Sequence, residues 1–93
     1  MSNSEIHLTP DEISNFARTL EQFAGQLHDS TNSLNGSLQQ LGDTWRDQAF
    51  TEFEAHFAQT RKSIDDFVSV SAAYIKFLQE KAELSRIAGN LKM

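Results

Sequence analysis

Two long stretches of the chain carry apolar residues at steps of three and four, which is the spacing of one face of an α-helix. In the first stretch these positions are Ile13, Phe16, Leu20, Phe23, Leu27, Leu34, Leu38 and Leu41. In the second stretch they are Phe50, Phe53, Phe57, Thr60, Ile64, Phe67, Ser71, Tyr74 and Leu78. Polar and charged residues fill most of the intervening positions, so the pattern predicts two amphipathic helices.

Three neighbouring residues mark the start of the first helix. Thr9 suits the N-cap position, and Glu12 stands three residues later, so the pair forms a capping box. Pro10 falls at the first helical position, where its missing amide hydrogen costs little. The sequence therefore predicts a flexible tail over residues 1–8 and a helix over about residues 10–41.

The apolar pattern is interrupted at Gly42, Asp43 and Thr44. Glycine suits the end of a helix, whereas Asp or Thr suits the N-cap of the next one. The sequence predicts a turn over residues 42–46, a second helix over about 47–88 and a short tail over 89–93. Two long helices joined by a short turn lie antiparallel. The predicted fold is therefore all-α, an antiparallel two-helix hairpin over residues 9–88.

A hairpin of this size has too little apolar surface of its own for a stable core. Small chains commonly gain the missing core by oligomerising. We therefore expect two hairpins to dimerise into a four-helix bundle, as a homodimer or with a paralogous hairpin. The residues predicted to form this core and dimer seam are Phe16, Phe23, Leu27, Leu34, Phe53, Phe57, Ile64, Phe67 and Tyr74.

The second helix is longer than the first, so its C-terminal part is predicted to extend beyond about residue 80 without a partner helix. This extension carries an apolar stripe that consists of Phe77, Leu84, Ile87 and Leu91. Such anchors are typical of a helix that docks in a groove of another protein, although a second dimer contact or a frayed end gives the same pattern. Mixed charges at Lys81, Glu83 and Arg86 disfavour a membrane-surface helix.

Charge and composition narrow the function classes. The net charge is −5, and the eight Lys and Arg residues are scattered, which argues against a nucleic-acid partner. There is no Cys, so disulfides and Cys-bound metal are excluded. His28 and His56 fall on different predicted helices out of register, and no metal ligands are assigned. The acidic residues alternate with the apolar positions and are interpreted as a solvated face, so no catalytic or cofactor-binding residues are assigned either.

The N-terminal segment MSNSEIHLTPDE lacks the basic and apolar regions of a secretory signal peptide, and no apolar run is long enough to span a membrane. The sequence therefore predicts that any export uses a route other than the general secretory one.

The central run Leu41-x-x-x-Trp45-x-Asp47-x-Ala49-x-x-x-Phe53 resembles the turn motif of the WXG100 family. These are small helical hairpins, often virulence-associated, that type VII secretion systems export. The resemblance implies an exported effector, or a hairpin that escorts a secreted toxin, with Trp45 and Asp47 at the turn as a recognition motif. It also implies a secretion ATPase or a toxin as a further partner, and no enzymatic activity.

Two positions depart from the family pattern. Asp47 stands where the motif has Gly, and Asp is common in turns and caps, so we expect it to help start the second helix. Tyr74 is followed at the fourth place by Leu78, where many exported members have Asp or Glu. These departures favour an alternative function, in which the chain is a cytosolic helical adaptor or regulator unrelated to export. For Trp45, packing over the end of the seam and docking to a partner are both compatible with the sequence.

Overall fold

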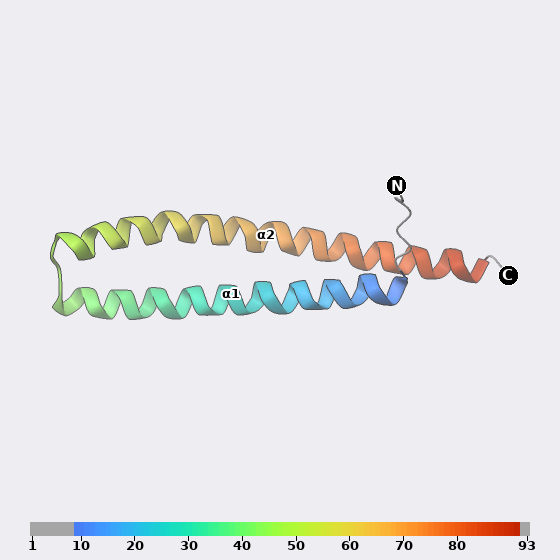
Figure 1. The fold of residues 1–93 in the computed structure, drawn as a ribbon, viewed down its shortest axis with the longest axis horizontal. Helices are drawn as coiled ribbons and strands as arrows, with labels where there is room; N and C mark the ends of the chain where they lie inside the picture. Colours follow the sequence, from blue (N-terminus) through green and yellow to red (C-terminus); the bar gives the residue numbers. More distant parts are fainter. Residues whose placement is uncertain (1–8, 92–93) are drawn as a thin grey trace, which may run out of the picture.

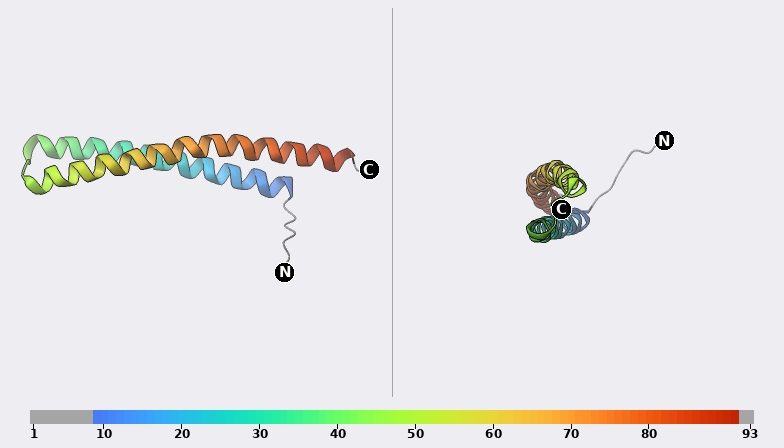
Figure 2. Two further views of the ribbon diagram at one scale, coloured as in Figure 1. Left: turned by 90° about the horizontal axis from the view of Figure 1, so that it is seen from above. Right: turned by 90° about the vertical axis from the view of Figure 1, so that its left-hand side faces the viewer.

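The computed structural model describes residues 9–91, which form two α-helices joined by a short connection (Figure 1). Helix α1 spans Pro10–Thr44 and helix α2 spans Gln48–Leu91. The helices lie side by side and run in opposite directions, in a molecule of 68 × 28 × 14 Å. Seen from above, they cross at a shallow angle (Figure 2), as helices with heptad-spaced contacts do. The predicted all-α antiparallel hairpin is confirmed.

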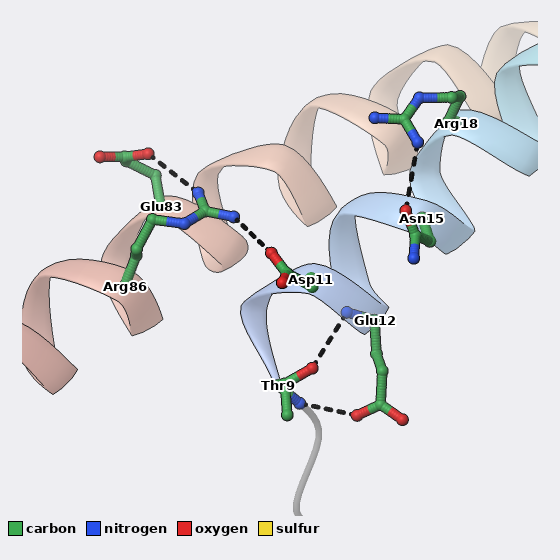
Figure 3. Close-up of polar contacts among 7 residues, drawn as sticks. All are labelled: Thr9, Asp11, Glu12, Asn15, Arg18, Glu83 and Arg86. Carbon is green, nitrogen blue, oxygen red and sulfur yellow. Dashed lines mark hydrogen bonds and ion pairs between the residues drawn. The ribbon is translucent and has the colours of Figure 1, made fainter.

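The predicted capping box is present at the start of α1 (Figure 3). The Thr9 hydroxyl accepts a hydrogen bond from the Glu12 amide at 3.1 Å, and the Glu12 carboxylate accepts one from the Thr9 amide at 2.9 Å. Pro10 occupies the first turn. In the same turn, the Asp11 carboxylate lies 3.4 Å from the Arg86 guanidinium of α2, so the start of α1 is tied to the C-terminal part of α2 (Figure 3).

The helix ends differ from the predicted positions. Helix α1 continues through Asp43 and Thr44 to Trp45, whose amide donates to the Leu41 carbonyl at 2.9 Å. Gly42 therefore lies inside the helix, and its small size serves a side-chain contact instead of a helix end. Helix α2 continues past Gly89, because one Gly costs only about 1 kcal/mol relative to Ala in a long helix. Residues 89–91 of the predicted tail over 89–93 belong to α2, whereas residues 92–93 and the predicted tail over 1–8 lie outside the described residues.

Most of the buried residues on the inner face of α1 are small. The buried positions of α1 are Ile13, Ala17, Ala24, Thr31, Leu38 and Gly42. On α2 they are Phe50, Phe57, Ser71 and Ala82. These positions are separated by four, seven, eleven or fourteen residues, each a sum of steps of three and four, which is the pattern of two helices coiled about one seam. Small side chains at the contact let the two backbones approach closely.

The structure places most of the predicted seam beside the contact between the helices. Phe57 is buried, and Leu27 and Ile64 are half-buried. The other predicted seam residues are 42–57% exposed, and they are Phe16, Phe23, Leu34, Phe53, Phe67 and Tyr74. In α1 the residue next in sequence takes the inner position, since Ala17 is 1% exposed and Phe16 is 57% exposed. The hairpin thus turns most of its small seam residues inward and most of its aromatic residues outward, with Phe50 and Phe57 as the buried exceptions.

We predict that Phe57→Asp prevents folding, because it replaces a buried ring of the core cluster with Leu38 and Phe50 by a carboxylate that burial desolvates. The loss is at least about 3 kcal/mol, which is comparable to the whole stability of a core this small. Phe57→Leu keeps an apolar side chain and costs about 1 kcal/mol, so it serves as the matched control. Circular dichroism at one fixed protein concentration measures the helical content of both. Equal helicity of the Asp variant and the wild type would contradict the inward placement of Phe57.

Candidate interaction surfaces

Asp47 lies in the connection between the helices, and each oxygen of its carboxylate accepts one hydrogen bond there. Oδ1 accepts a hydrogen bond from the Phe50 amide at 2.9 Å, which makes Asp47 the N-cap of α2. Oδ2 accepts a hydrogen bond from the indole Nε1 of Trp45 at 2.8 Å. The expectation that Asp47 helps start the second helix is confirmed, whereas Asp43 and Thr44, the other candidate caps, lie inside α1. The bond to Trp45 was not predicted from the sequence.

The position of Trp45 is compatible with both roles that the sequence left open. Its ring meets the Phe50 ring edge-on, with centroids 5.7 Å apart and planes at 64°. The side chain is nevertheless 43% exposed. Trp45 therefore packs over the end of the seam and still presents ring surface to the outside.

Phe50 is the most deeply buried aromatic residue at the turn, with 1% exposure. Its ring lies directly over Gly42, and a Cβ atom added to Gly42 would lie 2.9 Å from the ring edge. The Arg46 guanidinium lies 5.3 Å from the centre of the Phe50 ring, and its Nε donates to the Gly42 carbonyl at 3.0 Å. Gly42 is thus required by the contact with Phe50, which closes the turn.

A groove of about 400 Å³ opens beside the turn on one side of the hairpin. Its walls are mainly apolar, with Leu34 and Leu41 from α1, Phe53 from α2 and the ring of Trp45 at the end. All four side chains are between 43% and 52% exposed. Trp45 is therefore part of a larger apolar surface and is not an isolated exposed aromatic residue.

The outward aromatic residues of the two helices share one side of the hairpin. Phe23 of α1 and Phe67 of α2 touch edge-on, with ring centroids 6.0 Å apart, so they fix the common side. Phe16 and Phe53 lie one and two heptads from these residues and so project in the same direction. The remaining large side chains of this apolar face are Leu34, Leu41, Val70, Tyr74 and Phe77, all more than 40% exposed. Val70 was missed because the sequence pattern was followed along a single stripe.

The C-terminal part of α2 projects beyond the start of α1 (Figure 1). Buried packing against α1 reaches Ala82, which is 1% exposed, and the ion pair of Arg86 with Asp11 extends the contact one turn further, beyond the predicted limit near residue 80. Of the predicted docking stripe, Phe77, Leu84 and Ile87 are 53%, 66% and 45% exposed. Phe77 and Leu84 border a shallow groove of about 330 Å³ that is lined by α2 alone. Leu91 lies in α2, and its side chain is outside what the structure describes.

Polar residues enter the seam near its middle without forming a catalytic arrangement. The half-buried Arg61 donates to the Asn32 side chain across the seam at 2.8 Å, which links α1 to α2. His28 contacts Asn32 at 3.3 Å on α1, and His56 lies on α2. Across residues 9–91 there is no group of three or more metal-ligating side chains. Within the same range, no helix combines the length and apolar character that crossing a membrane requires.

The sequence of this chain matches the model of a known protein family. A family model described as WXG100, proteins of 100 residues with WXG, matches residues 5–90. The chain belongs to the WXG100 family. Membership confirms the family resemblance found in the central run of the sequence, and no curated protein sequence matches the chain. In this WXG100 chain the carboxylate of Asp47 makes two hydrogen bonds that Gly has no side chain to make.

Solved structures of EsxB, a secreted protein from Bacillus anthracis str. Sterne, have the same fold. The selenomethionine-labelled form has a TM-score of 0.77 and 22% identity, over 94% of this chain and 99% of that chain. The wild-type form in another crystal has a TM-score of 0.75 and 23% identity, over 89% and 95%. The long WXG100 hairpin is thus a fold that these sequences share at low identity.

We predict that Gly42→Ala destabilises the hairpin by about 1–3 kcal/mol, because the new methyl group meets the Phe50 ring in a packed site. Gly36→Ala is the matched control, since a Cβ there meets nothing within 4 Å. The control is expected to stabilise the protein by about 0.4–1 kcal/mol through the unfolded state. Thermal unfolding at equal concentration measures both variants. Similar shifts at the two glycines would show that Phe50 does not press on Gly42.

Proposed function

We propose that this chain is a non-enzymatic hairpin protein of type VII secretion that works through protein–protein contacts. The observation that carries this proposal is the apolar face, which leaves large aromatic side chains half exposed along both helices. Contiguous apolar surface of this extent marks an interaction site in a monomer. The chain acts either as an exported effector or as the partner that escorts a secreted toxin.

The apolar face fits another hairpin as its first partner. Two hairpins that meet through these faces bury Phe16, Phe23, Phe53 and Phe67 in a four-helix bundle, with one pair of helices from each chain. The thin seam within one hairpin makes this second layer of packing necessary for stability. The partner is a second copy of the chain or a paralogous hairpin.

Export is supported by family membership and by the description of the EsxB structures as a secreted protein. We propose that the chain leaves the cell without a general secretory signal peptide. The structure offers a reason why position 78 has Leu in place of the acidic residue of the family export signal. The Leu78 side chain is half-buried and belongs to the seam. An acidic residue there would be partly desolvated. A paralogous partner therefore supplies the acidic signal when the pair is exported, whereas a homodimer, in which both copies have Leu78, uses a divergent signal.

The stripe on the C-terminal projection of α2 is proposed as the contact for a larger partner, either a secretion ATPase or a toxin. Leu84 is two-thirds exposed, with a shallow groove beside it and no neighbouring helix, so it is available for such a contact. Trp45 and Asp47 at the opposite end of the hairpin form the second recognition element.

A second candidate function is a cytosolic helical adaptor or regulator that uses the same apolar face. Leu78 in the seam favours this alternative, because the chain itself lacks the acidic export residue at that place. Export measurements separate the two functions, whereas measurements of self-association do not.

We predict that the pure chain is a dimer of twice its 10.5 kDa mass and that Phe16→Ser weakens the association about tenfold or more. Phe16 is chosen because it is 57% exposed within one hairpin. His28→Ser is the matched control, since it also removes a ring but lies five residues from Phe23, about 140° around α1. Light scattering over a dilution series measures the mass. A chain that stays monomeric at all concentrations would show that the partner is a paralogue.

We predict that Leu84→Ser combined with Ile87→Ser lowers the amount of protein in the culture medium severalfold, while helical content and dimer mass stay unchanged. Within the hairpin, the Leu84 side chain is 66% exposed and the Ile87 side chain is 45% exposed. Gln79→Ser, on the same helix outside the stripe, is the control. Intact protein is quantified in medium and cells beside a cytoplasmic marker of lysis. Wild-type protein found only inside intact cells would favour the cytosolic adaptor.

A further inference from the structure

The carboxylate of Asp47 is shared between two hydrogen bonds that have different consequences. The bond from the Phe50 amide to Oδ1 caps α2 and would serve any hairpin of this kind. The bond from the Trp45 indole to Oδ2, at 2.8 Å, contributes nothing to the cap. A charged acceptor at this distance makes a strong hydrogen bond. The second oxygen therefore acts on the Trp45 side chain alone.

Trp45 is held at two points. Its indole N–H is bound to Asp47, and its ring edge rests on the buried Phe50 ring at 5.7 Å. Phe50 is itself fixed between Gly42 and the Arg46 guanidinium. Because the hydrogen bond to Asp47 and the contact with Phe50 hold different parts of the Trp45 ring, together they fix its orientation. In that orientation Trp45 forms the end wall of the groove beside Leu34, Leu41 and Phe53.

We infer that Asp47 is a positioning residue that fixes Trp45 through its indole N–H, so that the exposed part of Trp45 recognises an apolar side chain of the partner. This inference deepens the proposed function and rests on it for the existence of a partner. Tryptophan has one hydrogen-bond donor and no acceptor, so the bond to Asp47 uses all of its polar capacity. What remains exposed is ring surface among apolar neighbours.

The energetics of binding lead to the same type of partner. A partner that placed a carbonyl or carboxylate against the indole N–H would have to displace the Asp47 carboxylate from a charge-assisted bond. It would also bring its acceptor close to that negative charge. An aliphatic or aromatic side chain that covers the ring leaves both hydrogen bonds of Asp47 intact and buries only apolar surface.

The test uses the single indole N–H signal of this chain, since Trp45 is its only Trp. In Asp47→Asn the side-chain oxygen still caps α2, because Asn and Asp are equally good N-caps. Its other group is an amide that donates and cannot accept the indole hydrogen. Asp43→Asn is the control, with the same change of charge on an exposed residue four positions earlier.

We expect the Trp45 indole signal to shift in Asp47→Asn and its hydrogen to exchange with water about tenfold faster, while helical content is unchanged. The control leaves both properties at wild-type values. Dimethyl sulfoxide, added as a small hydrogen-bond acceptor, moves the indole signal of Asp47→Asn and not that of the wild type. These measurements need only the pure chain, so their outcome is independent of whether export or dimerisation is found.

Two results would overturn the inference. One is an indole signal that has the same position and exchange rate in Asp47→Asn and in the wild type, because the N–H would then have no bond to Asp47. The other is a wild-type signal that moves with dimethyl sulfoxide as far as that of the variant, because the N–H would then be available to an acceptor on a partner.

Discussion

Close approach of the two helices is the constraint on which the rest of this molecule depends. Ala17 and Ala24, with Gly42 at the turn, give α1 an inner face that α2 can approach closely. Each of these small residues follows or precedes a large one in the sequence, and only one of the two can face inward. The large neighbours Phe16, Phe23 and Leu41 are therefore left outside, and a single packing requirement produces both the thin seam and the apolar face.

The same arrangement distinguishes the stability that comes from contacts within one hairpin from the stability that contacts with a second chain can add. Contacts within one hairpin involve few large side chains, and most of those, including Phe50, Leu38 and Phe57, lie toward the turn. The aromatic surface available between chains is larger than that within the chain. A partner hairpin that binds only the folded form would therefore stabilise it by mass action.

The helical pattern, the capping box and the antiparallel arrangement could all be predicted from the sequence, because each depends on local residue types and on their period. The inner face could not, since Phe16 and Ala17 differ by one step of about 100° and both continue a pattern of three and four. The size of the side chain at the contact between the helices decides which of the two residues faces inward. That contact exists only once the second helix has packed against the first. For the turn, sequence reasoning attributed to Gly42 a helix end, whereas a ring from the next helix requires that glycine. The bond from Trp45 to Asp47 had no sequence pattern to indicate it.

The cluster of Phe50 on Gly42 and Arg46 has a consequence for how the chain folds. It joins residues only eight positions apart, so the loop that it closes is the shortest of any contact between the helices. The entropy lost on closing a loop grows with its length, so contacts toward Ile13 and Ala82 become favourable only after those near the turn have formed. We therefore expect contacts to form first at the turn and then successively toward the open end of the hairpin. Changes near Phe50 alter the rate of folding, whereas changes near Asp11 and Arg86 alter the rate at which the open end separates.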